Sequence, residues 1–455
     1  MQLSSLTAIS PLDGRYSNRT EQLRPIVSEY ALIFYRLHVE IAWLILLAET
    51  HAITEFSPLH TDEKQFLESL LSHFDETEAL KIKAIEKITS HDVKAIEYYL
   101  REKIEAHPTL KRASAFIHFA CTSEDINNLA YALMLQKTRD TIIMPQLDNI
   151  IHTINQFAKT TADNAMLSRT HGQPATPTTL GKEFKNSAMR LSAHVSLLKN
   201  IPIVGKCNGA VGNFNAHMAA YPDVEWLALS EQFVTSLGLT WNSHTTQIEP
   251  HDFLAQFLNG LTVCHTILID FSRDIWGYIA LHYFTQQKLD HEVGSSTMPH
   301  KINPIDFENA EGNLGVANAL ATHLAQKLPI SRWQRDLTDS TVLRNIGSIF
   351  GYAVIAYASL EKGLSKLIPN TALMKNELNH HWEILAEPIQ TVMKRYGIAD
   401  AYEQLKTMTR GADFSAQQFR DFIDTLTIPD AAKKQLKLLT PENYIGLAKT
   451  LAEKE

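Results

Sequence analysis

One segment, Gly-Ser-Ser-Thr-Met-Pro-His-Lys-Ile-Asn-Pro, ends at Pro304 and places two hydroxyls, a cation and an amide beside a predicted helix start. Asn303 is a good N-cap residue, and Pro304 suits the first position of a helix. Lys301 then lies just outside a helix N-terminus, where free N–H groups and positive charge favour an anion such as a carboxylate. Ser295 and Ser296 precede it on a glycine-hinged loop that can close over a bound anion. Spacing alone does not choose between the two serines.

A second candidate is His171, in the segment Ser-Arg-Thr-His-Gly-Gln-Pro-Ala between two predicted helices. An imidazole in such a loop is accessible to substrate and titrates near neutral pH, as a general acid or base must. A histidine that only stabilises the loop fits the same pattern. A third candidate joins Arg335, Ser340 and Arg344 around a helix start. It predicts either a clamp for phosphate or carboxylate, or a solvated charged face.

Several motifs that resemble metal or cofactor sites are incomplete. His291-Glu292 begins a zinc-protease motif, but the second histidine is absent. Gly181-Lys182 lacks the rest of a phosphate-binding loop, and Gly209-Ala-Val-Gly212 follows no predicted strand. The twenty histidines show no convincing metal-ligand spacing beside a carboxylate. We therefore predict neither a metal nor a cofactor.

Long helices are the elements that must position these groups. Residues 124–163, 250–286 and 340–366 keep apolar residues near a 3.6-residue period, and residues 178–200 and 304–327 do so over shorter lengths. Helices of this length are typical of a bundle. The polar candidates fall in the breaks between the helices, where catalytic groups are commonly mounted.

Shorter helices are predicted on both sides of this central region. Before it, residues 92–106 form a helix that begins after Ser90-His91; beyond Pro369, helices are expected over residues 416–426, after Ser415, and 430–438. No alternating strand pattern is convincing, so the predicted fold is all-α. The expected domains are an N-terminal helical domain (1–111), a central long-helix bundle (112–366) and a C-terminal helical domain (367–455).

Composition excludes some classes of function. With 42 basic and 50 acidic residues the net charge is −8, which disfavours non-specific binding to nucleic acid or anionic membranes. Three widely spaced cysteines do not form a disulfide framework and favour a reducing cytoplasm. The N-terminus lacks the pattern of a signal peptide, and the longest apolar run, residues 41–48, is bracketed by glutamates. No membrane span is expected.

The chain as a whole resembles the fumarase/aspartase superfamily. Residues 294–304 match every fixed position of its signature, Gly-Ser-Ser-x-Met-Pro-x-Lys-x-Asn-Pro. Within the superfamily it is similar to the adenylosuccinate lyase family in its longer bacterial type. The supporting segments are residues 10–16, 91–95, 116–128, 168–176, 246–252 and 335–344.

The resemblance implies β-elimination of fumarate from adenylosuccinate, giving AMP, and from succinylaminoimidazole carboxamide ribotide. One group removes a proton from the carbon next to a carboxylate, a dianionic aci-carboxylate follows, and another group protonates the departing nitrogen. It implies Ser295 as the base and His171 as the acid. The junction at Lys301 would stabilise both the serine alkoxide and the intermediate.

The resemblance also assigns binding roles. It implies that the nucleotide, chiefly its phosphate, is held by Arg15, Tyr16, Arg335, Ser340 and Arg344. The succinyl carboxylates would be held by Thr122, Ser123, Gln247, Lys301 and Asn303, and His91 and Asp92 would lie near the leaving nitrogen. Ser90 stands where relatives commonly carry Thr or Asn, so a weaker contact is expected there. The family further implies three helical domains and a homotetramer whose active sites combine loops from three subunits.

Two alternatives stay open. Argininosuccinate lyase, fumarase and aspartase share the superfamily fold, but their substrates carry no phosphate for Arg15, Tyr16 and the two arginines of residues 335–344. A catalytically silent structural relative is the second alternative, and the retention of His171 and Ser295 argues against it.

Overall fold

Helices make up nearly all of the regular structure in the computed structural model, which describes residues 1–287, 297–298, 300–409 and 414–454. This confirms the all-α prediction. The N-terminal helices are η1 (Glu21–Leu23), α1 (Arg24–Val27), α2 (Glu29–Glu49), α3 (Thr61–Ser72), α4 (Glu76–Thr89), α5 (Asp92–Glu105) and η2 (Leu110–Phe116).

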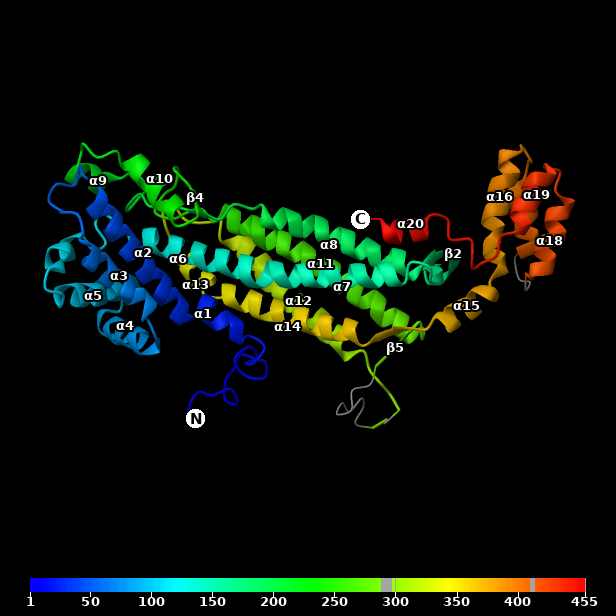
Figure 1. Cartoon of the computed structure of the whole chain (residues 1–455), viewed down its shortest axis with the longest axis horizontal. Helices are drawn as coiled ribbons and strands as arrows, with labels where there is room; N and C mark the ends of the chain where they lie inside the picture. The colour runs from blue at the N-terminus through cyan, green and yellow to red at the C-terminus, as the bar shows by residue number, and fades with distance from the viewer. Residues whose placement is uncertain (288–296, 299, 410–413, 455) are drawn as a thin grey trace. The chain divides into compact units, whose positions relative to one another are not determined.

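The long helices follow, with the shorter helices α9, α10 and α13 between them (Figure 1). They are α6 (Ser123–Thr138), α7 (Met144–Thr160), α8 (Leu180–Lys199), α9 (Asn215–Ala220), α10 (Trp226–Ser236), α11 (Asp252–Ala280), α12 (Ile305–Lys327), α13 (Thr338–Leu343) and α14 (Ile346–Ser365). The C-terminal helices are α15 (Thr371–Asn379), η4 (Trp382–Leu385), α16 (Ala386–Arg395), α17 (Ala401–Thr409), α18 (Ala416–Thr425), α19 (Asp430–Lys437) and α20 (Ala448–Glu453).

Capping residues explain several predicted helix starts. The His91 imidazole accepts a hydrogen bond from the Lys94 amide at 3.1 Å and caps α5. Ser415 forms a capping box with Gln418 at the start of α18. The start of α12 differs by one residue from the prediction, because the Pro304 carbonyl already accepts the first helical hydrogen bonds and occupies the N-cap position itself.

The predicted helix over residues 124–163 contains a π-turn, η3 (Arg139–Ile143), between α6 and α7. The Arg139 guanidinium donates to the Ile201 carbonyl at 2.7 Å, which holds this turn against the chain that follows α8. Apolar periodicity cannot reveal a single inserted residue of this kind.

The structure also contains short strands, which no alternating pattern in the sequence indicated. Three two-stranded sheets occur in the described residues: β1 (Ala165–Thr170) pairs antiparallel with β2 (Gln173–Thr179), β3 (Val204–Gly205) pairs parallel with β4 (Thr240–Trp241), and β5 (Phe284–Gln286) pairs antiparallel with β6 (Leu367–Pro369). The segment around His171, predicted as a loop, is therefore a hairpin. Its polar, proline-containing strands give no alternating apolar pattern.

The chain divides into two compact units. Unit 1 comprises Met1–Leu147, His194–Thr266 and Gly312–Tyr357; unit 2 comprises Asp148–Ala193, Ile267–Glu311 and Ala358–Glu455. In unit 1, Trp43 of α2 packs against Phe233 and Trp226 of α10. In unit 2, Phe184 of α8 packs against Phe271 of α11. A second core of unit 2 lies among its C-terminal helices, around Phe419 and Ile389.

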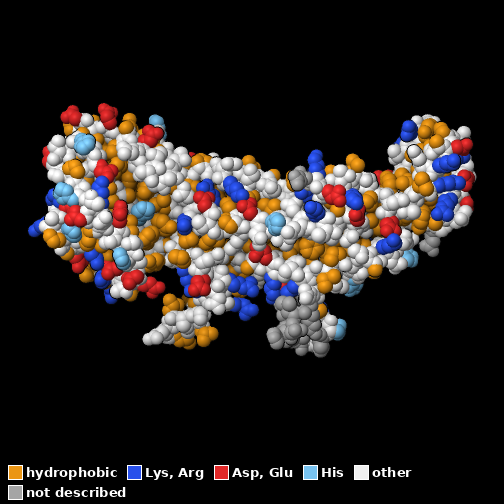
Figure 2. All heavy atoms as spheres, viewed as in Figure 1, with side chains coloured by type: hydrophobic (Ala, Val, Ile, Leu, Met, Phe, Trp, Pro, Cys, Tyr) orange, Lys and Arg blue, Asp and Glu red, His pale blue; other side chains and the backbone are white. Residues whose placement is uncertain are grey.

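Two helical segments, Glu21–Glu49 and Asp252–Ala280, are long and apolar enough to cross a membrane by length and composition alone. Within their most apolar windows, 72% and 50% of the residues are buried inside the structure, as in the core helices of soluble proteins. Length and composition are therefore weak evidence for a membrane span. On the face drawn in Figure 2, acidic and basic side chains intermix over the N-terminal helices of unit 1.

Candidate active site

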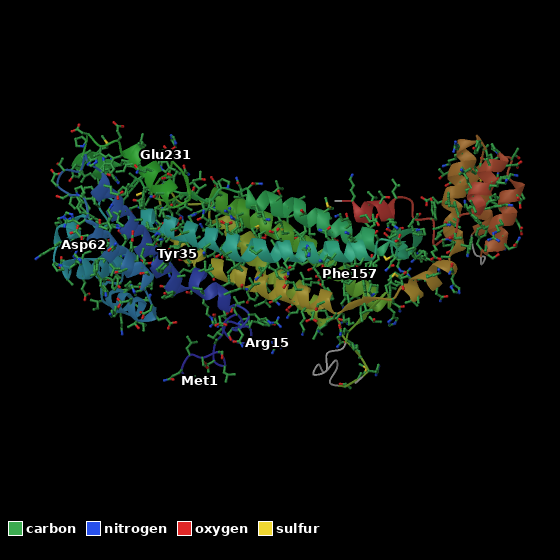
Figure 3. The ribbon with its side chains drawn as sticks, viewed as in Figure 1. Met1, Arg15, Tyr35, Asp62, Phe157 and Glu231 are labelled. Carbon is green, nitrogen blue, oxygen red and sulfur yellow. The ribbon has the colours of Figure 1, made fainter. Side chains whose placement is uncertain are left out.

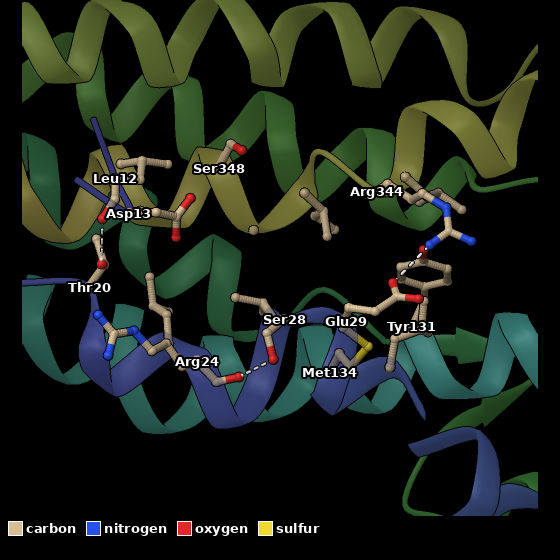
Figure 4. A pocket seen from close by; sticks show the side chains of 17 residues that line it. Leu12, Asp13, Thr20, Arg24, Ser28, Glu29, Tyr131, Met134, Arg344 and Ser348 are labelled. Atoms are coloured by element: carbon tan, nitrogen blue, oxygen red, sulfur yellow. Dashed lines mark hydrogen bonds and ion pairs between the residues drawn. The ribbon is translucent and has the colours of Figure 1, made fainter. Parts of the chain in front are cut away.

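In unit 1, an arginine and two carboxylates meet between α2, α5 and α13. Arg344, just after α13, donates to Glu29 at 2.9 Å and to Asp92 at 3.2 Å. Glu29 also pairs with Lys83 of α4 at 3.1 Å. Figure 4 shows Glu29 and Arg344 facing one another beside Tyr131. Arg344 thus reaches Asp92, another predicted site residue, across more than 250 residues of sequence.

Asp92 is the most tightly bound predicted residue of this group. One of its oxygens accepts from Arg36 at 2.7 Å as well as from Arg344, and the other accepts from the Val93 amide at 2.9 Å. Burial is the largest single effect and would raise the pKa of Asp92, but Arg36, the Val93 amide and Arg344 together outweigh burial and lower it. The carboxylate is therefore ionised at neutral pH and fixed in direction.

Arg335, in the segment between α12 and α13, contacts the first turn of α6. Its guanidinium contacts Glu124 at 2.9 Å and Asp339 at 3.7 Å. The Ser340 amide donates to the same Asp339 carboxylate at 2.7 Å. Both arginines of the predicted clamp are thus held by carboxylates.

Thr122 and Ser123 form the start of α6, as predicted. Asp125 accepts from the Thr122 amide at 2.8 Å and, with no side-chain exposure, also from Lys206 at 2.9 Å. The amides of Asn208 and Gly209 complete its hydrogen bonds at 2.9 and 3.1 Å. A buried ion pair thus anchors this helix start.

Gln247 is placed by the chain on both sides. Its side chain donates to the Ala210 carbonyl at 2.9 Å, and its backbone amide donates to the Gln334 carbonyl at 3.3 Å. Gln334 is the neighbour of Arg335, so the predicted carboxylate-binding and phosphate-binding segments adjoin here.

Other predicted residues of unit 1 are more exposed. Arg15 lies on the irregular N-terminal segment (Figure 3), with its guanidinium 5.9 Å from the centre of the Tyr16 ring. Ser90 is exposed and has φ 52°, the left-handed conformation that ends α4. His91 caps α5 through one ring nitrogen and is half exposed.

A cavity of about 380 Å³ adjoins this group. It is lined by residues of the N-terminal segment, η1, α1, α2, α6, α13 and α14, including Asp13, Arg24, Glu29 and Tyr131, and by Arg344 just after α13. Burial raises the pKa of Tyr131 to about 12, so its hydroxyl stays protonated.

In unit 2, His171 and Gly172 form the two-residue turn of the β1–β2 hairpin, with φ of 54° and 74°. Two positive φ values are typical of a type I′ turn. The imidazole is exposed and makes no hydrogen bond or ion pair with any described residue. The hairpin itself is anchored, because Arg169 pairs with Glu377 of α15, which also accepts from Tyr283.

Lys301 and Asn303 also belong to unit 2, just before α12. The Lys301 amide donates to the Met298 carbonyl at 3.0 Å, and its side chain is exposed. Asp306, in the first turn of α12, pairs with Lys366 at 2.8 Å. Ser295 and Ser296 lie outside the described residues.

Sequence reasoning missed four side chains of this site: Glu29, Arg36, Glu124 and Asn127. A signal existed for Arg36, because an arginine four residues before Glu40 interrupts an otherwise apolar helix. Buried charges require partners, so these two predict buried ion pairs. Glu40 does contact His118, at 2.6 Å.

One group of potential metal ligands, Cys121, Asp125 and Cys207, lies within 4.8 Å. Asp125 is already saturated by Lys206 and three backbone amides. Burial raises the pKa of the Cys121 thiol well above its ordinary value, which disfavours the thiolate that a metal needs. The donor set therefore does not fit a metal ion.

Comparison with known proteins identifies the relatives of this arrangement. Residues 14–318 match a lyase family, and residues 331–445 match the adenylosuccinate lyase C-terminal family. Adenylosuccinate lyase of Haemophilus influenzae is 56% identical over 454 residues, covering 100% of both chains. That of Escherichia coli K12 is 55% identical over 453 residues, covering 100% of this chain and 99% of the relative.

Solved structures share the fold at much lower identity. Fumarate lyase from Mesorhizobium sp. BNC1 has a TM-score of 0.76 at 18% identity and covers 95% of this chain and 96% of that one. The 3-carboxy-cis,cis-muconate lactonizing enzyme of Pseudomonas putida has a TM-score of 0.72 at 21% identity, with 95% of each chain covered. The chain therefore belongs to the adenylosuccinate lyase family of the fumarase/aspartase superfamily.

Proposed function

We propose that the chain is a carbon–nitrogen lyase that eliminates fumarate from adenylosuccinate, and from the succinylated aminoimidazole carboxamide ribotide, in purine nucleotide biosynthesis. The observation that carries the proposal is the identity of 56% across the whole of a relative named adenylosuccinate lyase. Arg335 and Arg344 of unit 1 support the proposal, because a nucleotide substrate carries a phosphate that they could bind.

Within this proposal, Ser295 removes the proton next to the carboxylate and His171 protonates the departing nitrogen. The aci-carboxylate formed between these steps carries extra negative charge. Lys301, just before the N-terminal end of α12, is the group that would stabilise it. Thr122, Ser123, Gln247 and Asn303 would hold the carboxylates in place.

The nucleotide would be held in unit 1. Arg335 and Arg344 would bind the phosphate with Arg15, Tyr16 and Ser340, while Ser90, His91 and Asp92 would lie near the reacting nitrogen. His171 and Lys301 belong to unit 2. The family membership supports a homotetramer with active sites shared between subunits, and helical domains of residues 1–111, 112–366 (the long-helix bundle) and 367–455. The enzyme would act in the cytoplasm on a small nucleotide, without nucleic acid or membrane.

Turnover by the purified full chain tests the proposal. We expect fumarate release from adenylosuccinate, with activity on argininosuccinate, malate and aspartate at least roughly a hundredfold lower, because those substrates leave the arginine pair without an anion. Absence of turnover on adenylosuccinate, in protein with an intact helical circular dichroism spectrum, would exclude the proposal. Comparable turnover on argininosuccinate would instead indicate another lyase of the superfamily.

A further inference from the structure

Arg335 and Arg344 are joined through the interior of unit 1 by a continuous chain of side chains. We call this chain the relay; it consists of Asp92, Arg36, Asn127 and Glu124. It links α5, α2 and α6, which are three separate helices of the fold. The two arginines that the relay joins are those that would bind the nucleotide phosphate.

Each step of the relay has hydrogen-bonding distance. Asp92 lies 3.2 Å from Arg344 and 2.7 Å from Arg36. The Arg36 Nε donates to the Asn127 Oδ1 at 2.8 Å. The Asn127 Nδ2 in turn donates to Glu124 at 2.8 Å, and the same Glu124 oxygen contacts Arg335 at 2.9 Å.

Burial is deepest in the middle of the relay, whereas Asp92, its member beside Arg344, is 26% exposed. The Arg36 side chain is 2% exposed and that of Glu124 is 5% exposed, whereas Arg344 is 42% exposed and Arg335 is 17% exposed. A ligand from solvent can therefore reach the two end arginines but not Arg36 or Glu124. A buried charge with a missing partner is costly, so the members of the relay hold one another in fixed positions.

Asn127 gives the relay its direction. Its oxygen must accept from a cationic guanidinium and its amino group must donate to a carboxylate, so only one orientation of the amide satisfies both neighbours. An aspartate of the same shape would keep the acceptor for Arg36 but would place a second carboxylate against Glu124. Glu124 would then lose its fixed position, and Arg335 with it.

We propose that Arg36 and Asn127 are positioning residues for the substrate phosphate. They touch no ligand themselves, but they fix Asp92 and Glu124, which set the spacing between Arg344 and Arg335. The inference rests on the proposed function, because it takes the phosphate of a nucleoside monophosphate as the anion that bridges the two arginines. It differs from a role in stability alone, since it predicts a loss of affinity that depends on the phosphate.

Asn127→Asp tests the proposal in the full-length enzyme. We expect KM for adenylosuccinate and the inhibition constant of AMP to rise roughly tenfold, the scale of a small misplacement of binding groups, with kcat within about threefold of wild type. The inhibition constant of adenosine, which has no phosphate, should change little. Arg36→Lys keeps the buried charge but loses the fork that bonds two partners at once, and should shift the AMP-to-adenosine ratio in the same direction. It also provides the measurement if Asn127→Asp fails to fold.

Asn128→Asp is the matched control. Asn128 is as buried as Asn127 and is its neighbour on α6, but its amide bonds only backbone groups. Its substitution should lower the melting temperature without changing the ratio of the AMP and adenosine constants. The proposal is overturned if Asn127→Asp and Arg36→Lys leave that ratio at the wild-type value, or if Asn128→Asp shifts it equally. Inactive wild-type enzyme would instead reject the proposed function, so the two failures are distinguishable.

Discussion

The predicted site residues of the two units are held in opposite ways. In unit 1, Asp92 and Arg335 are bound by partners that are largely buried, Arg36 and Glu124. In unit 2, the side chains of His171 and Lys301 are exposed and lack polar partners among the described residues. Charge fixes the first group, whereas the backbone conformation of a turn directs His171.

The difference matches the two tasks proposed for these groups. A phosphate needs cations at a fixed spacing, and buried ion pairs provide that spacing before substrate arrives. A proton donor needs access to the departing nitrogen, and an exposed imidazole at the tip of an anchored hairpin has that access. In the proposed active site, substrate would supply a contact for His171.

The largest effect is expected from breaking the deepest ion pair of unit 1. Lys206→Met leaves Asp125 buried without its cation, which should lower the free energy of unfolding by about 3–5 kcal/mol. Lys366→Met is the matched change in unit 2, where Lys362 remains 3.9 Å from Asp306. For Lys366→Met we expect the free energy of unfolding to fall by only about 1–2 kcal/mol. Urea midpoints of the two variants measure the contrast, and equal losses would contradict it.

His171→Asn should remove the acid without disturbing the turn. Asparagine suits the left-handed conformation that His171 adopts, so the hairpin should be retained. We expect kcat to fall about 100-fold, equivalent to about 2.7 kcal/mol, while KM changes by less than threefold. Steady-state kinetics with a melting curve on the same sample distinguish loss of the acid from loss of structure.

The same variant can show whether sites are shared between subunits. Mixing His171→Asn with Ser295→Ala, after verified subunit exchange, should restore part of the activity because some sites then carry both intact groups. A mixture as inactive as its components would argue for sites built within one chain.

Acid should lower the stability of unit 1 through protonation of His217. Burial lowers its pKa to about 4, and neither ring nitrogen has a hydrogen-bond partner. The unfolded chain binds this proton from about pH 6.5 downward, so stability is full above that pH and falls toward pH 4. We expect a loss of about 2 kcal/mol between pH 7 and pH 5 from this group.

Urea midpoints measured across this pH range check the expectation. His217→Phe should flatten the dependence, since phenylalanine suits the surrounding Trp43, Phe214 and Trp226 and binds no proton. His171→Asn, which changes an exposed histidine, should leave the slope unaltered. A wild-type slope in His217→Phe would assign the acid sensitivity to other groups.

The smallest effect is expected at the hairpin turn. Gly172→Ala adds a methyl group into open space but at φ 74°, which should cost about 1 kcal/mol. Gly397→Ala has a matching φ of 73° and equally open space elsewhere in unit 2. Both should lower the melting temperature slightly, but only Gly172→Ala should also reduce kcat. Equal kinetics in the two variants would mean that the turn does not position the acid.

Local signals predicted much of this fold. The starts of α5 and α18 followed from capping residues at His91 and Ser415, because those interactions span only three residues. The hairpin around His171 was missed because its stability comes from backbone pairing and from a turn that an unusual residue occupies. The sequence indicated that His171 could act as an acid or base, but it did not indicate the conformation of the segment that carries His171.

Contacts across the fold were beyond such signals. The residue types of Arg335, Arg344 and Asp92 indicated binding, but no spacing rule brings Arg344 to Glu29 or Arg36 to Asn127. Those neighbours depend on how α2 packs against α6. The buried Arg36 and Glu40 of α2 were detectable in the sequence as charged residues in an apolar helix. Nothing in the sequence indicated their partners.

The relay has a consequence for cooperativity within one site. Because it has a cation at each end, linkage requires that any strengthening of an anion at Arg344 by one bound at Arg335 be returned by the same factor. A fragment bound at one arginine would therefore change the affinity of a second fragment at the other by the same factor in both directions. That factor, measured in solution by titrating two weak anions together and separately, would report how firmly the interior of unit 1 couples its two arginines.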